Sequence, residues 1–279
     1  MKTFKTEKAS TALIPRYVFW SGGADSTYML LRLLEEDLPV TEIFFSDTGM
    51  EFDIMYEYIE KVESFIEGKY GRRVIHLHPK KEQNYKQFSR GTGIIRGKEQ
   101  VRGIPRKLEP CWLQRNAKIY PFDRWKKENR IGEHLIYIGY TASELKRAGM
   151  KSTDDDSSKL VASNHLYPLI LWGVTNNNTK EELQKMGMLN PLYEHFDRTG
   201  CFMCPKVGIQ QYYTLWRFYP DTWKWLRKEE KKLRKLGNVF NSQFSIEYSI
   251  KEMEKIFSSG VYDLETRNTK DSDFCFCII

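Results

Sequence analysis

A six-residue segment near the N-terminus, residues 21–26, carries side chains that can hold a phosphate group. Ser21 and Ser26 supply hydroxyls, and Gly22 and Gly23 let the backbone approach an anion without a Cβ in the way. Asp25 would repel a bare phosphate, so it suggests a metal ion between carboxylate and phosphate. The simpler alternative is a Gly-Gly turn with a helix cap at Asp25 or Ser26.

The residues around this segment predict the elements that would shape it into an anion cradle. A short apolar run precedes it and an apolar helical pattern follows it, so a strand, a glycine turn and a helix start come in that order. The N–H groups and the dipole of the helix start would then face the anion. No Gly-Lys-Ser/Thr occurs in the chain, so this is not the loop that carries a Lys after its last Gly.

Strand and helix patterns alternate along the first part of the chain. The expected strands cover residues 17–20, 40–45, 74–77 and 134–140, and the expected helices cover residues 26–37, 53–67 and 113–128. This alternation predicts an α/β fold, a doubly wound parallel sheet with helices on both faces. Ligands of such sheets lie beyond the carboxyl ends of the strands. Residues 89–107, with four glycines and several basic residues, are expected to form a loop.

Two further polar segments follow predicted strands. Asp47, Thr48 and Gly49 follow the second strand, where a carboxylate and a hydroxyl can bind ribose, a metal-bound phosphate or a second substrate. Gly139 lies at the end of the fourth strand, and Arg147 follows where it could hold anionic oxygens. Taken alone, the first segment is better explained as an Asx turn, and the second is also explained by a helix start with surface charge.

Five cysteines are the remaining candidates for chemistry. Cys201 and Cys204 form a Cys-x-x-Cys turn, which can point both sulfurs at one metal ion or pair them as a redox dithiol. One such pair is half of a metal site, and Cys111, Cys275 and Cys277 are candidates for further ligands. From the residues alone, metal ligands, redox thiols and inert buried cysteines all stay open.

The composition limits the class of protein. At 279 residues and 41% hydrophobic content, the chain can bury one large core, or one core and a small appended unit. No apolar run approaches the roughly 20 residues that span a bilayer, and the first ten residues lack a signal-peptide core. We therefore expect a cytoplasmic protein with no membrane partner. The net charge of +7 suits an anionic ligand, either a nucleotide or a nucleic acid.

The region after residue 207 is aromatic and basic and predicts a mainly helical C-terminal part. Lysines and arginines recur between residues 224 and 235, and a helix of this kind can grip the phosphates of a nucleic acid. The alternative is a solvated amphipathic helix, favoured because Glu229 and Glu230 dilute the charge.

Taken in order, the motifs resemble the phosphoadenosine phosphosulfate (PAPS) reductase family of the N-type ATP pyrophosphatases, also called the adenine-nucleotide alpha-hydrolase superfamily. The segments that carry the resemblance are residues 21–26, 47–52, 111–121, 139–147, 168–172, 190–193 and 198–205. The resemblance covers roughly residues 15–206. It implies a nucleotide-binding α/β domain over residues 1–206, followed by a helical, basic and aromatic region over residues 207–279.

The resemblance also implies roles for particular residues. Asp25 would hold Mg²⁺ at the phosphates, and Lys118 and Arg147 would reach phosphate or sulfate oxygens, which makes these three the expected catalytic residues. Cys111, Cys201 and Cys204 would hold an iron–sulfur cluster of the [4Fe-4S] type, with Cys275 or Cys277 as a further ligand. The expected nucleotide-binding residues are Ser21, Gly22, Gly23, Asp25, Ser26, Asp47, Thr48, Gly49 and Gly139.

The implied function is an enzyme that uses ATP or PAPS. It would act at the α-phosphate of ATP and release pyrophosphate, in sulfur transfer or nucleic-acid thiolation, with a nucleic acid as substrate and a sulfur-donor or redox protein as partner. One alternative is a reductase that releases sulfite from PAPS or adenylyl sulfate. Reductases of the family carry a catalytic Cys in a Glu-Cys-Gly-Leu-His segment, whereas this chain ends in Asp-Phe-Cys-Phe-Cys-Ile-Ile. Another alternative is a non-catalytic nucleic-acid-binding subunit of a modification or defence complex. The oligomeric state stays open.

Overall fold

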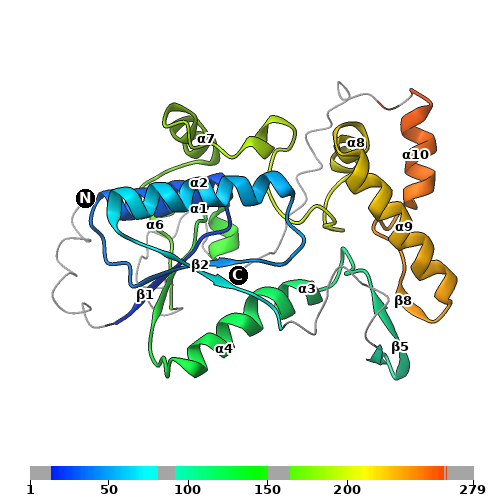
Figure 1. The fold of residues 1–279 in the computed structure, drawn as a ribbon, viewed down its shortest axis with the longest axis horizontal. Coiled ribbons are helices and arrows are strands. Elements are labelled where there is room, and N and C mark those ends of the chain that lie inside the picture. The colour runs from blue at the N-terminus through cyan, green and yellow to red at the C-terminus, as the bar shows by residue number, and fades with distance from the viewer. Residues whose placement is uncertain (1–13, 81–91, 150–163, 261, 263–279) are drawn as a thin grey trace. The chain divides into compact units, whose positions relative to one another are not determined.

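The computed structural model describes residues 14–80, 92–149, 164–260 and 262, and its chain divides by packing into two units (Figure 1). The first unit is built from Met1–Asp47, Asp53–His78 and Pro121–Glu194, and the second from Thr48–Phe52, Pro79–Tyr120 and His195–Ile279. The predicted boundary between residues 206 and 207 therefore falls within the second unit. Cys275 and Cys277 lie outside the described residues.

The first unit contains the predicted parallel sheet. Its strands are β1 (Arg16–Phe19), β2 (Glu42–Ser46), β3 (Val74–Leu77), β6 (Leu135–Tyr137) and β7 (His165–Leu166). They lie in the order β3-β2-β1-β6-β7, and every neighbouring pair is parallel. The four strands expected from apolar runs are all present, and the two-residue β7 is the addition.

Helices cover both faces of this sheet, as expected. Helices α1 (Ala24–Glu35) and α2 (Asp53–Tyr70) lie on one face and α4 (Tyr120–Glu128) on the other (Figure 1). Right-handed crossovers require this arrangement, because the chain moves from β1 out to β3 and then returns past β1 to β6. Side chains on one face of the sheet contact α4 directly, since Tyr17 and Phe44 pack against its Phe122 and Trp125.

Short elements complete the first unit around the carboxyl ends of its strands. They are the 3₁₀ turns η2 (Ala142–Ala148) and η3 (Pro191–Glu194), the single turn α6 (Pro168–Leu171) and the helix α7 (Asn176–Lys185). Thr175 starts α7 through a capping box, because its hydroxyl accepts from the backbone N–H of Asn178 and the Asn178 side chain accepts from the backbone N–H of Thr175.

The second unit is mainly helical, as predicted for the C-terminal part, with a small sheet that the sequence did not predict. Its helices are α3 (Trp112–Gln114), the π-helical turn η1 (Arg115–Ile119), α8 (Ile209–Phe218), α9 (Pro220–Leu236) and α10 (Ile250–Ser258). Its sheet joins β4 (Thr92–Ile95), β5 (Lys98–Gly103) and β8 (Val239–Asn241). The expected loop over residues 89–107 was wrong at β4 and β5, because these strands pair with each other and β5 also pairs with β8 from far along the chain. None of the helices among the described residues is long and apolar enough to cross a membrane.

Candidate functional site

The predicted phosphate loop forms the turn between β1 and α1. Gly22 adopts a left-handed backbone with φ of +73°, and Gly23 precedes α1 in an extended conformation as its N-cap. In the part of the chain that the structure describes, no acceptor lies on the backbone N–H groups of Gly22, Gly23, Asp25 and Ser26. Four N–H donors at a helix start form a site suited to an anion.

Any residue with a Cβ at position 22 would require its neighbours to move. A Cβ at this position would lie 2.7 Å from the Sδ of Met55 and 3.1 Å from the Cδ1 of Ile59, both on α2. The positive φ adds a conformational cost for any residue with a Cβ. The first glycine of the loop therefore allows the turn to pack directly on α2.

Two residues far along the chain form hydrogen bonds with this loop: Asn190, just before η3, and Tyr193, within it. Asn190 is fully buried, and its amide donates to the backbone carbonyl of Gly22 at 2.9 Å. The hydroxyl of Tyr193 accepts from the backbone N–H of Ala24, the first residue of α1, at 2.9 Å. The sequence placed both residues in a family segment but gave neither a role in the site. Their role depends on contacts across more than 160 positions, which the sequence pattern does not show.

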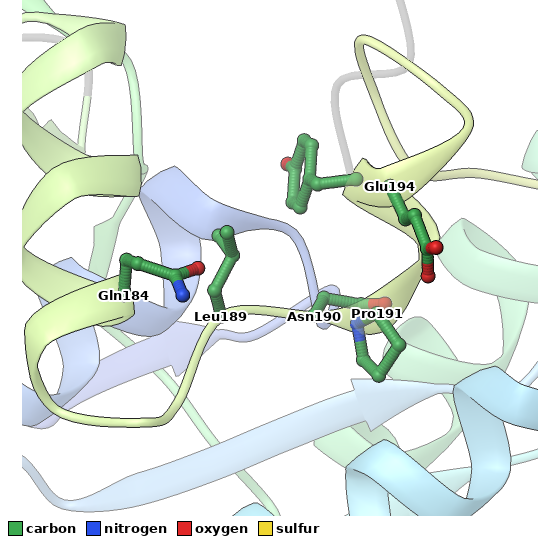
Figure 2. Close-up of a pocket in the computed structure, with 6 residues that line it drawn as sticks. Gln184, Leu189, Asn190, Pro191 and Glu194 are labelled. Carbon is green, nitrogen blue, oxygen red and sulfur yellow. The ribbon is translucent and has the colours of Figure 1, made fainter.

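A shallow hollow lies beside these two residues. It has a volume of about 320 Å³ and is lined by Gln184, Leu189, Asn190, Pro191, Tyr193 and Glu194. Figure 2 shows Gln184 and Leu189 on one side of the hollow, and Pro191 and Glu194 on the other. Because Asn190 and Tyr193 also bond to the phosphate loop, an occupant of the hollow would lie next to the start of α1.

Asp25 lies in a buried network that joins α1 to α7. Its Oδ1 accepts from the hydroxyl of Thr179 at 2.5 Å and its Oδ2 accepts from the amide of Asn176 at 2.9 Å. Burial is the largest cause that raises the pKa of this carboxyl, to about 6, and the charge of Glu144 adds to it. The two hydrogen bonds and Lys180 act in the opposite direction without cancelling the burial. The ionised form of this carboxyl is therefore disfavoured at its buried position.

Gly139 lies against the first turn of α1, as a nucleotide-binding role would require. A Cβ on it would come within 3.1 Å of the backbone N and Cα of Ser26. The next segment joins the Asp25 network, because the hydroxyl of Thr141 donates to the Oδ1 of Asn176 at 3.0 Å. The structure thus brings Asp25, Ser26 and Gly139 together.

The other predicted residues of the first unit are held by local partners. Asp47, at the end of β2, accepts a hydrogen bond from the hydroxyl of Tyr56 at 2.8 Å and lies 3.6 Å from the Nδ1 of His78. Arg147, in η2, pairs with Glu144 and lies over the ring of Tyr140, 4.4 Å from its centre.

The second unit holds the remaining predicted residues, gathered around Cys201. The Sγ of Cys201 lies 3.5 Å from the hydroxyl of Thr48 and 3.8 Å from the Oε1 of Glu51, and Thr48 donates to the same Oε1 at 2.9 Å. The backbone N–H of Phe202 donates to the carbonyl of Met50 at 3.0 Å. Thr48, which the sequence predicted at a nucleotide, thus contacts the Cys201 turn instead. Gly49, the next residue, has a left-handed backbone conformation.

The charges near Cys201 identify two more neighbours. Burial and the Glu51 carboxylate raise the pKa of the Cys201 thiol well above its usual value, while the Lys118 ammonium lowers it and Cys111 raises it further. Lys118 lies in the π-helical turn η1, seven residues after Cys111. Lys118 and Cys111 are therefore both close enough to Cys201 to act on its charge.

Cys204 completes this cysteine cluster, which we define as Cys111, Cys201 and Cys204. Its backbone N–H donates to the carbonyl of Cys201 at 3.1 Å, and its Sγ lies 3.8 Å from Arg198. None of the three forms a disulfide with another described residue, and all three residues are partly exposed. Thiols are the ligands that iron–sulfur clusters prefer. As placed, however, no three Cys, His, Asp or Glu side chains among the described residues are positioned to hold a metal ion together.

The parallel sheet with its glycine turn and the helical second unit define a Rossmann-like α/β protein with a helical C-terminal part. A sequence model of the phosphoadenosine phosphosulfate reductase domain matches residues 16–207, and the chain belongs to this family. The predicted family resemblance is confirmed, and membership supports a nucleotide-utilising role.

Two curated relatives come from Methanocaldococcus jannaschii, and both are described only as uncharacterized proteins. MJ0066 is 27% identical over 76% of this chain and 40% of its own length. MJ0973 is 24% identical over 80% of this chain and 52% of its own length. The chain thus spans about half the length of the curated relatives it matches.

Among solved structures, the chain is similar to the U34-tRNA thiolase NcsA from Methanococcus maripaludis with its [4Fe-4S] cluster. The match covers 80% of this chain and 72% of that chain, with 15% identity and a TM-score of 0.42. A likeness at this level supports no inference about the ligand or reaction of this chain.

Proposed function

We propose that this protein is an adenine-nucleotide-dependent enzyme that acts at the α-phosphate of ATP in a sulfur-transfer reaction. The observation that carries the proposal is the turn over residues 21–26, where four N–H groups without a described acceptor lie at the start of α1 in a chain of this family. The absence of a Lys after the last glycine of the loop separates it from the loops that cradle the β- and γ-phosphates.

In the proposed reaction an acceptor oxygen attacks the α-phosphorus, and the bond between the α-phosphorus and its bridging oxygen breaks. Pyrophosphate leaves with that electron pair, and a sulfur nucleophile then displaces AMP from the acceptor. The loop N–H groups would stabilise the negative charge that develops on the phosphate oxygens. Mg²⁺ held at Asp25 would supply charge neutralisation for the leaving pyrophosphate.

The rigidity of the loop matters as much as its donors. Asn190 fixes the carbonyl of Gly22, and Tyr193 occupies the N–H of Ala24, so the remaining donors are held in one arrangement. Donors that are fixed before the reaction need no reorganisation when charge develops.

The test uses the full chain with Mg²⁺ and ATP labelled at the α- and γ-phosphates. We expect ATP binding by calorimetry, and AMP and pyrophosphate as products once an acceptor nucleic acid and a sulfide source are supplied. Formation of ADP and phosphate, or no binding of ATP, would contradict the proposal. Binding needs no acceptor, so an unsuitable acceptor cannot disguise a missing nucleotide site.

We further propose that the cysteine cluster holds an iron–sulfur cluster. The support is its donor type and its location in one unit of the fold. The three side chains do not form a ligand set as placed. Such a cluster would supply a site for binding and delivering sulfur.

This second part is tested by the iron content and visible absorption of anaerobically purified and reconstituted protein. We expect iron in the native chain and its loss in Cys111→Ser, Cys201→Ser and Cys204→Ser. Native protein without iron after reconstitution, or full iron in all three variants, would exclude the cluster while leaving the ATP site untouched.

The family name itself favours one other reaction, the release of sulfite from PAPS or adenylyl sulfate. That reaction needs a thiol nucleophile, and Cys275 and Cys277 are the candidates. Sulfite release from a sulfonucleotide by the native chain, lost when both are replaced by Ser, would favour reduction over attack on ATP.

A further inference from the structure

Helix α9 divides its side chains sharply between an apolar buried face and a basic exposed face. The buried side chains of the helix are Trp223, Leu226, Glu229, Glu230 and Leu233. From residue 224 to residue 235, every exposed side chain of the helix is basic: Lys224, Arg227, Lys228, Lys231, Lys232, Arg234 and Lys235. The sequence alone does not show this division, because its two glutamates stand among the lysines.

The two glutamates of α9 face the inside of the second unit. Glu229 and Glu230 are 6% and 3% exposed. Glu230 accepts from the backbone N–H of Ile250, at the start of α10, so it helps to fix α10 against α9. Each pairs with one basic side chain of the helix, Glu229 with Lys232 at 3.8 Å and Glu230 with Arg234 at 3.2 Å, so the dilution expected from the sequence reaches only those two cations.

Four lysines form one straight row on that face, which we call the lysine row: Lys224, Lys228, Lys231 and Lys235. Their spacing of four, three and four residues keeps them on one side of the helix. The row is about 16 Å long at 1.5 Å per residue. Lys224 pairs with the exposed Asp221, whereas Lys228, Lys231 and Lys235 form no ion pair with any residue that the structure describes.

We propose that the lysine row is a docking surface for double-helical nucleic acid, bound through its phosphate backbone. Charge complementarity carries the assignment, since three lysines without acidic partners lie along a straight line of a length that meets several phosphates. A duplex fits better than a single strand because none of the exposed side chains of α9 is aromatic. Single strands are held largely by bases stacked on aromatic rings.

The proposal is independent of the nucleotide site, because every residue it uses belongs to the second unit and none belongs to the phosphate loop. Failure of one therefore leaves the other standing.

The test is the binding of the full chain to a fluorescent 20-base-pair duplex, as DNA and as RNA, between about 50 and 200 mM salt. The variant is Lys228→Gln/Lys231→Gln/Lys235→Gln. We expect its affinity to fall by about tenfold or more, and the slope of log affinity against log salt to become shallower by roughly three. The matched control is Lys69→Gln/Lys127→Gln/Lys185→Gln, which removes the same charge from exposed positions of the first unit.

Equal affinity of the two triple variants for the duplex would overturn the proposal, because the loss of affinity would then depend on net charge and not on the position of the lysines. Tighter binding of single-stranded DNA or RNA than of either duplex would overturn the choice of a duplex. Binding of polyglutamate as tight as that of the duplex would indicate an acidic protein partner instead. Unchanged thermal unfolding of both variants excludes a folding defect, and unchanged ATP binding separates this surface from the nucleotide site.

Discussion

Gly22 and Asp25, both in the turn between β1 and α1, are constrained for different physical reasons. Gly22 is required by space and backbone conformation, since a Cβ would strike Met55 on α2. Asp25 is required by its partners, because Thr179 and Asn176 of α7 both donate to it. Gly22 lets the loop pack on α2, and Asp25 joins α1 to α7.

Replacement of Gly22 by Ala should destabilise the protein by about 1–3 kcal/mol and abolish ATP binding, because the turn must move away from α2. Urea unfolding and calorimetry with ATP would measure the two effects. The control is Gly68→Ala in α2, where nothing lies within 4 Å of the added Cβ. This change should stabilise the helix by about 0.5–1 kcal/mol. Equal behaviour of the two variants would contradict the packing argument.

Asp25 predicts a pH dependence of stability in the absence of nucleotide and Mg²⁺. Its folded pKa of about 6 lies above the ordinary value of 3.8, so the folded state binds more protons than the unfolded state between these values. The free energy of unfolding should therefore fall as the pH rises from about 4 to about 6, by at most about 3 kcal/mol, and then level off. In Asp25→Asn this component should be absent. The same slope in both proteins, measured by urea unfolding, would assign it to other groups.

At the scale of elements, the start of α1 is held by η3, a short turn that follows it by about 170 positions. Tyr193 contacts the backbone of α1 through its hydroxyl, so this contact can be removed with little change in the shape of the side chain. This contact links the nucleotide loop to the hollow in Figure 2.

Tyr193→Phe should leave one N–H of α1 without its acceptor and let the loop relax. We expect ATP binding to weaken by about three- to tenfold, which corresponds to the roughly 1 kcal/mol of one hydrogen bond. Tyr248→Phe, at an exposed position, is the matched control and should bind ATP as the native chain does. Unchanged affinity in Tyr193→Phe would show that the loop is fixed without this contact.

At the scale of the whole molecule, the second unit depends on chain segments that are far apart in sequence. The five-residue piece Thr48–Phe52 packs in the second unit, where the ring of Phe52 contacts Phe196 and Tyr219. The family match ends at residue 207, inside this unit. The residues beyond the match therefore complete the packing of a segment that lies within it.

A chain cut after residue 207 should lose the packing around Phe52 and expose apolar surface. We expect strong binding of a hydrophobic dye and a lower free energy of unfolding than that of the full chain. Tyr219→Ala tests the same contact in a full chain and should cost about 1–3 kcal/mol, less than a core change because Tyr219 is only partly buried. A truncated chain that unfolds as cooperatively as the full chain would show that the family region folds alone.

The sheet of the first unit was predictable because its strands are buried runs of apolar residues, such as residues 17–20 and 40–45. β7 and the β4-β5-β8 sheet were not, because β7 has only two residues and β5 is paired with a strand about 140 positions away. The prediction that α9 is a diluted amphipathic helix treated every charge as exposed. Burial of Glu229 and Glu230 could be learned only from the packing of α9 against α10.

The sequence by itself determined the family, the parallel sheet and the glycine turn, because these depend on local patterns: apolar runs, a Gly-Gly pair and motifs in a fixed order. Only the tertiary structure decided which distant residues complete the site. It placed Asn190 and Tyr193 on the phosphate loop, Thr48 beside Cys201, and the lysine row on an outer face. The physical reason is that hydrogen bonds and burial act through space, so a partner 150 positions away leaves no periodic pattern beside the residue it holds.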